Sequence, residues 1–115
     1  MESMTWFTEA LRKQPENPTV AKEAANAAFE LGEFELGIAL LRPAATAKPS
    51  DPVLHYDLAV HLLLSGRPEE AYQSLQRAAS LERHADTTRL MGRVERILAG
   101  SAPCPRSAAE LRGSP

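Results

Sequence analysis

Apolar side chains return every three or four residues along most of the chain, which is the spacing of one face of an α-helix. In the segment VLHYDLAVHLLL, Leu54, Leu58 and Leu62 form such a row, and in EEAYQSLQRAASL the row includes Ala71 and Leu75. The pattern therefore predicts an all-α chain.

Residues that begin and end helices separate these rows. Asn17 and Asp51 each precede a proline, the arrangement of an N-cap followed by the first helical position. Gly32 and Gly66 supply the left-handed conformation that ends a helix, and Asp86 is expected to cap a later helix. The predicted helices span residues 3–14, 18–31, 34–47, 52–65, 68–81 and 86–99.

Two segments depart from this regular pattern. Pro43 falls inside the helix predicted at 34–47, where an interior proline removes one backbone hydrogen bond, so we expect a bend there and not a break. Residues 101–115, SAPCPRSAAELRGSP, are predicted to form a flexible tail in which SAAELR forms a turn of helix.

The helical segments repeat at a fixed interval. Glycine occurs at positions 32, 66 and 100, a spacing of about 34 residues. Other residues keep the same step, in the columns Ala25 with Ala59, Phe7 with Leu41 and Leu75, Ala10 with Ala44 and Ala78, and Pro15 with Pro49. Agreement in several columns indicates a repeated two-helix unit.

Composition and charge narrow the classes of function. Hydrophobic residues make up 43% of the 115 residues and aromatic residues only 5%, so the core must be built mainly from Ala, Leu, Val and Ile. The formal net charge is −2, with 13 Lys and Arg against 15 Asp and Glu. This balance predicts neither a nucleic-acid partner nor an anionic membrane surface.

The single cysteine, Cys104, cannot form an intramolecular disulfide and is interpreted as a free thiol in a reducing compartment. The N-terminal segment MESMTWFTEALRKQ has no uninterrupted apolar stretch, so neither a secretory signal nor a membrane span is predicted. A cytoplasmic protein is the expectation.

The 34-residue unit with its small and large columns resembles the tetratricopeptide repeat family. Ala25 and Ala59 stand at the small position of the first helix, whereas Gly37 and Ala71 stand at the small position where the two helices cross. The resemblance implies a right-handed α-solenoid of about six helices over residues 1–100. Its parts are a half repeat (1–17), two repeats (18–51 and 52–85) and a terminal helix (86–100), followed by the tail 101–115.

Half repeats at both ends leave two explanations open: a short protein capped by its own end helices, which we favour, or a fragment of a longer array. Ala24 replaces the usual large residue before Ala25, and Gly92 with Arg93 replaces the large-then-small pair in the last helix.

The resemblance also implies a concave groove lined by the first helix of each pair. The candidate partner-binding residues, read off by helical phase, are Lys22, Asn26, Phe29, Tyr56, Asp57, Val60, Leu63, Met91 and Val94. The apolar members suit an aliphatic side chain or amphipathic helix of a protein partner. An equally weighted alternative is that the C-terminal tail or a further helix covers this patch.

Chaperone-binding members of the family hold a peptide's terminal carboxylate with Lys and Asn side chains. Lys22 and Asn26 match the first Lys and Asn of that clamp, but Asp57 stands where a second Asn is expected. Thr87 and Met91 replace the two basic residues. The carboxylate of Asp57 would repel the ligand, so the clamp is disfavoured.

The other candidate sites carry little specific chemistry. A basic patch is predicted around the last helix from Arg83, Arg89, Arg93 and Arg96, although a solvated basic face is the commoner explanation for such a run. The three histidines lack metal-ligand spacing and are interpreted as surface or groove-edge residues. No nucleophile with a base or phosphate-binding loop is recognisable, so we expect no enzyme activity, metal or cofactor.

Binding without catalysis is therefore the main hypothesis: a protein interaction adaptor that takes a peptide or helix of a partner in its concave groove. Two alternatives remain. The chain is the repeat domain of a larger enzyme or chaperone-type protein, or it is a self-assembly unit whose end helices stack into a homo-oligomer.

Overall fold

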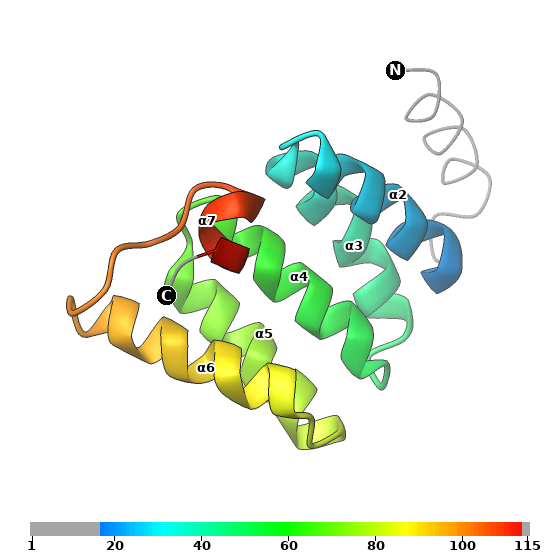
Figure 1. Ribbon diagram of the computed structural model, residues 1–115. Coiled ribbons are helices and arrows are strands. Elements are labelled where there is room, and N and C mark those ends of the chain that lie inside the picture. Colours follow the sequence, from blue (N-terminus) through cyan, green and yellow to red (C-terminus); the bar gives the residue numbers. More distant parts are fainter. Residues whose placement is uncertain (1–16, 114–115) are drawn as a thin grey trace.

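The computed structural model describes residues 17–113 and contains helices without strands in that range. Figure 1 shows the helices α2 to α6 as a row of antiparallel neighbours, with the short α7 drawn over one end of α4. Their bounds are α2 Pro18–Glu30, α3 Phe34–Ala47, α4 Pro52–Leu64, α5 Pro68–Leu81, α6 Ala85–Leu98 and α7 Ala108–Gly113.

Consecutive helices from α2 to α6 pack on one another, and α2 also contacts α4. This nearest-neighbour packing is the construction of an α-solenoid, in which stacked two-helix units bury a continuous core. The helices predicted from residue 18 onwards are confirmed within one residue at each end. The helix predicted at 3–14 lies outside the described residues.

Most of the predicted caps are present. Asn17 accepts hydrogen bonds from the backbone N–H groups of Thr19 and Val20, and Asp51 accepts one from Val53. The glycines after α2, α4 and α6 have φ of 76°, 80° and 81°, the left-handed region that ends helices without a Cβ clash.

The predicted cap of α6 is wrong by two residues. His84 is the N-cap, and its Nδ1 accepts a hydrogen bond from the backbone N–H of Asp86 at 3.1 Å. Asp86 instead lies in the first turn, where its negative charge is stabilised by the positive end of the helix.

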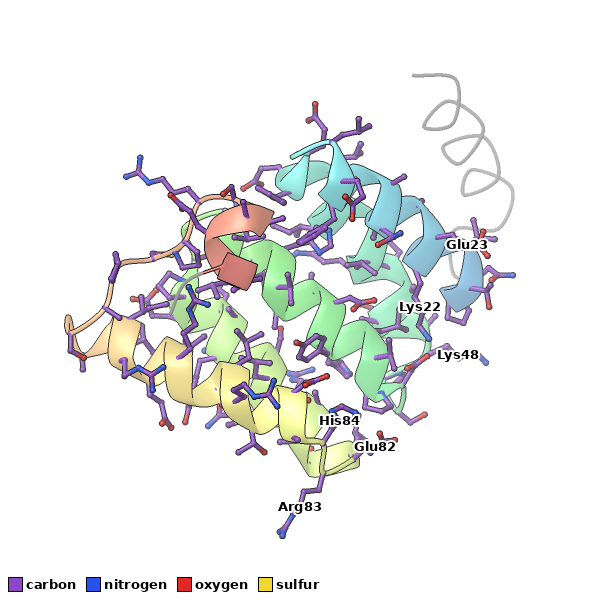
Figure 2. The ribbon with its side chains drawn as sticks, in the orientation of Figure 1. Lys22, Glu23, Lys48, Glu82, Arg83 and His84 are labelled. Carbon is purple, nitrogen blue, oxygen red and sulfur yellow. The ribbon has the colours of Figure 1, made fainter. Side chains whose placement is uncertain are left out.

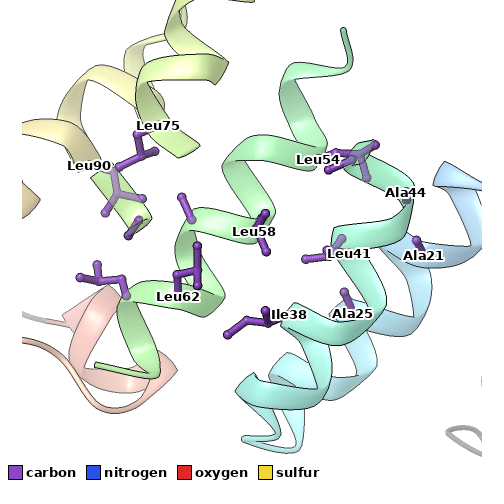
Figure 3. Close-up of a cluster of buried hydrophobic side chains, with 14 of the residues drawn as sticks. Ala21, Ala25, Ile38, Leu41, Ala44, Leu54, Leu58, Leu62, Leu75 and Leu90 are labelled. Atoms are coloured by element: carbon purple, nitrogen blue, oxygen red, sulfur yellow. The ribbon is translucent and has the colours of Figure 1, made fainter. Parts of the chain in front are cut away.

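The core lies between the helix layers and consists mainly of leucine and alanine (Figure 3). The largest completely buried side chains are Leu41, Leu54, Leu62, Leu63, Leu75 and Val94. Buried alanines on α2 let that helix approach its neighbours closely, because each presents only a methyl group. The few aromatic residues are therefore not needed to fill the interior.

Gly37 lies at the crossing of α3 and α4 and is directly covered by the imidazole ring of His61. A Cβ at position 37 would overlap that ring, so no larger residue fits without displacing it. Ala71, the equivalent residue one repeat later, is also completely buried. Both residues therefore lie in the close-packed interior, as expected for a helix-crossing position.

Pro43 does not interrupt α3, which continues from Phe34 to Ala47. The proline lies on the exposed side of the helix, as does Ala39, whose carbonyl oxygen would accept from residue 43 in a regular helix. Water can bind that carbonyl oxygen, which explains why the helix tolerates the proline.

The C-terminal segment differs from the expected flexible tail in its described part. After α6 the chain turns back, Pro105 is buried, and Cys104 and Leu111 pack against the core. The thiol of Cys104 donates a hydrogen bond to the carbonyl oxygen of Leu63, at the end of α4. The expected helical turn in SAAELR is present as α7.

Candidate functional site

An open concave groove lies between α2, α4, α6 and the C-terminal segment. Its empty volume is about 1620 Å³, which includes its open mouth. First helices of successive units line it because each contributes the same face to one side of the solenoid. The lining residues are Phe29, Tyr56, Val60, Asp86, Arg89, Leu90, Arg93, Arg96, Ser101, Ala102, Pro103 and Leu111.

Of the predicted apolar groove residues, Phe29, Tyr56 and Val60 line the groove and are partly exposed. Leu63 and Val94 are completely buried, so the structure places them in the core beneath the groove and not on its surface. Their helical phase places them next to the groove-facing side, but neighbouring helices cover them. The projection of a single helix does not reveal this. Met91 is partly buried and packs against the core.

Phe29 belongs to a small aromatic cluster at the α2 side of the groove. Its ring meets those of Phe34 and His61 edge-on, with centroids 5.9 and 5.8 Å away. His61 is only 4% exposed, and its ring nitrogens lie 2.8 Å from the carbonyl oxygen of Asp57 and 3.2 Å from that of Ala25. This imidazole therefore bridges α4 to α2.

The interpretation of the histidines as surface or groove-edge residues is wrong for two of them, which are buried. His61 and His55 are each 4% exposed, and Nε2 of His55 lies 2.8 Å from the carbonyl oxygen of Pro49. Both rings find backbone carbonyl partners inside the fold, and sequence spacing carries no sign of such partners. Only His84 is exposed.

Lys22 and Asn26 do not line the groove together with Tyr56 and Val60. The ammonium of Lys22 lies 2.8 Å from Oδ2 of Asp51, where α2 approaches the start of α4 (Figure 2). Because the carboxylate of Asp51 already binds this ammonium, Lys22 is not free to hold the carboxylate of a peptide. This is a second reason against a carboxylate clamp, besides the presence of Asp57.

The pKa values of the two carboxyl groups in this region, Asp51 and Asp57, are shifted in opposite directions. Burial raises the pKa of Asp57 above its ordinary value of 3.8. Burial also acts to raise the pKa of Asp51, but the hydrogen bond and charge of Lys22, together with backbone hydrogen bonds from Val53 and Leu54, hold that pKa below 3.8. Burial likewise raises the pKa of Tyr56, so its hydroxyl stays protonated and able to donate in the groove.

These shifts predict opposite effects of two matched substitutions. Ionised Asp57 destabilises the fold above its raised pKa, so Asp57→Asn should increase the free energy of unfolding at neutral pH. That gain should vanish as the pH falls below 3.8, where the carboxyl is protonated in both the folded and the unfolded chain.

Asp51→Asn should decrease the free energy of unfolding at neutral pH, and this loss should shrink as the pH falls through the lowered pKa. Urea denaturation over a pH series measures both, and equal signs would contradict the assignment.

The predicted basic patch does not form one surface. Arg83 points away from the helices in the α5–α6 connection (Figure 2), whereas Arg89, Arg93 and Arg96 line the groove. Arg89 is 77% exposed and pairs with Asp86 at 3.4 Å. The groove itself therefore has a basic edge of three arginines against one carboxylate.

Arg93 has a distinct role among these arginines. Its guanidinium donates to the backbone carbonyl oxygens of Leu111 at 2.6 Å and Glu110 at 3.2 Å, both on α7. The contact could not be predicted from the sequence pattern, which indicates only a flexible tail over residues 101–115.

A sequence signal for α7 was present in Ser107-Ala-Ala-Glu110, the pattern of a capping box. The hydroxyl oxygen of Ser107 accepts from the backbone N–H of Glu110, and the Glu110 carboxylate accepts from that of Arg106. The second bond reaches one residue before Ser107, so this is a variant of the capping box, and the two bonds together explain why so short a helix begins where it does.

Other kinds of site find no support in the part of the chain that the structure describes. Among residues 17–113, histidine, cysteine and carboxylate side chains do not gather in groups that would hold a metal ion. Within the same range, every helix is too short or too polar to span a bilayer.

Comparison with known proteins identifies the same architecture. The model of the family described as Tetratricopeptide repeat matches residues 28–93, more than half of the chain. A solved structure titled "MamA MSR-1 C2" superposes with a TM-score of 0.74 at 23% identity, over 87% of this chain and 57% of that one. The likeness concerns the fold, and the chain spans less than two thirds of that protein. No curated protein matches.

Proposed function

Because the chain belongs to the tetratricopeptide repeat family, we propose that it is a scaffold whose concave groove binds an amphipathic, acidic helix of a partner protein. Family membership supports protein interaction in general, and members are typically non-catalytic. The proposal of an acidic helical ligand is supported by the groove between α2, α4 and α6, which has apolar side chains on its floor and arginines along one edge.

The floor supplies the apolar part of this recognition. Phe29, Tyr56 and Val60 are partly exposed there and adjoin Leu90. Helices bind such grooves by inserting aliphatic side chains spaced three or four residues apart. The hydroxyl of Tyr56 adds one hydrogen-bond donor beside them.

The edge supplies the charge preference. Arg89, Arg93 and Arg96 follow one another at intervals of three or four residues on α6, so they lie along one side of that helix. Only Asp86 opposes them among the groove-lining residues. Acidic side chains of a bound helix would therefore complement the α6 wall and speed association.

Selection from a library of short displayed peptides tests this proposal. We expect enriched peptides to carry aliphatic residues at helical spacing together with Asp or Glu. Val60→Glu should weaken their binding about tenfold or more, because it places an unpaired charge on the apolar floor. Gln73→Glu adds the same charge on an exposed position of α5 outside the groove and should leave binding unchanged. Peptides without a shared pattern, or equal binding to Val60→Glu, would refute the proposal.

A further inference from the structure

The groove already contains a short helix, namely the chain's own α7. We infer that the end of the groove around Arg93 is an exchangeable binding site for a short helical segment, and that α7 is its resident ligand. We call this site the α7 seat and define it by Arg93, Phe29 and Val60, which line the same cavity as Leu111 of α7.

The contacts in the α7 seat are those of a docked ligand. Leu111 packs against the core as an aliphatic anchor and lines the same cavity as Phe29 and Val60. Arg93 binds the carbonyl oxygens of residues 110 and 111, groups that a short helix leaves without intrahelical donors. Cys104 and the buried Pro105 anchor the connection before the helix, whereas α7 itself is held mainly by Leu111 and Arg93.

The form of α7 suits exchange. It spans only the six residues Ala108–Gly113, and helices of this length are marginal without tertiary contacts. Residues 99–107 connect it to α6 without helical structure, so the segment can leave without unfolding the repeats. Tethering in cis gives it a high effective concentration, which a competing segment must overcome.

The chemistry of α7 defines the ligand class: a short helix in which an aliphatic residue follows small and acidic ones, as in Ala-Ala-Glu-Leu. If the proposed function holds, a partner helix of this kind competes with α7 for the α7 seat. The chain's own C-terminal segment then limits access to the groove.

The test uses the full chain and a labelled peptide of residues 105–115, PRSAAELRGSP, followed by fluorescence anisotropy. Leu111→Ser in the chain removes the anchor of the resident helix without changing the α7 seat. We expect the peptide to bind this variant about 10- to 100-fold more tightly than the wild type. Ser107→Ala, which weakens only the α7 cap, should act in the same direction to a smaller extent and serves if Leu111→Ser folds poorly.

Substitutions on the seat side must have the opposite effect. Arg93→Gln added to Leu111→Ser should abolish the gain in peptide binding, whereas Arg83→Gln, which changes an arginine pointing away from the groove, should not. The inference fails if neither Leu111→Ser nor Ser107→Ala increases peptide binding, or if Arg93→Gln leaves the gain intact.

The same variants separate this inference from the proposed function. Library peptides that bind the wild type and Leu111→Ser equally would overturn the exchange of α7 while leaving groove binding in place. If library peptides bind Val60→Glu as tightly as the wild type, groove binding is overturned, even where the chain's own peptide still occupies the α7 seat.

Discussion

Gly37→Ala should lower the free energy of unfolding by about 1–3 kcal/mol, although alanine is the better helix former. The added Cβ would overlap the ring of His61, which is buried and has its ring nitrogens 2.8 and 3.2 Å from carbonyl oxygens of α4 and α2. The ring cannot simply rotate away, because Phe29 and Phe34 flank it edge-on. Urea denaturation measures the loss.

Gly92→Ala is the matched control. Gly92 also lies inside a helix, but a Cβ there would meet no atom within 4 Å. The substitution should therefore raise the free energy of unfolding by about 0.5–1 kcal/mol, the helix-propensity gain alone.

A double-mutant cycle isolates the contact. In a His61→Ala background the space above Gly37 is open, so Gly37→Ala should cost much less than in the wild type. An equal cost in both backgrounds would show that the imidazole is not what excludes a side chain from this helix crossing.

Leu41→Ala and Leu75→Ala should each lower the free energy of unfolding by about 2–5 kcal/mol. The two residues occupy equivalent positions one repeat apart and are both completely buried. Each substitution leaves a cavity at the packing surface between helices. Because the surroundings repeat, we expect similar losses from the two substitutions in urea or thermal denaturation.

Leu81→Ala serves as the control for this pair, because Leu81 ends α5 and is 43% exposed. Its effect should stay within about 0.5 kcal/mol. A loss confined to one of the two buried leucines would mean that the two units do not share one packing register.

Much of the fold could be predicted because its signals are local. The Asn17 and Asp51 caps, the glycines with positive φ and the leucine rows each act within a few residues of their own position. Because each unit repeats the same signals, a helix boundary that is ambiguous in one unit can be placed from the equivalent residues of the next. The His84 cap was missed because the competing Asp86 stands two residues later and has the stronger cap propensity.

The candidate site was predicted less well because exposure depends on the neighbouring helices. Helical phase placed Tyr56 and Val60 on the groove, but the same phase also selected Leu63, which other elements cover completely. The role of Arg93 depends on where the chain returns after α6, and no periodicity encodes that return.

The sequence alone determined the helices, their repeat and the small residues at the crossings, because hydrogen-bond caps and helical spacing are short-range properties. Only the tertiary structure decided which side chains remain in the groove and which lie beneath it. It also decided that His61 bridges two helices and that α7 lies at Arg93. These features depend on contacts between residues far apart in the chain, among them His61 with Ala25 and Cys104 with Leu63.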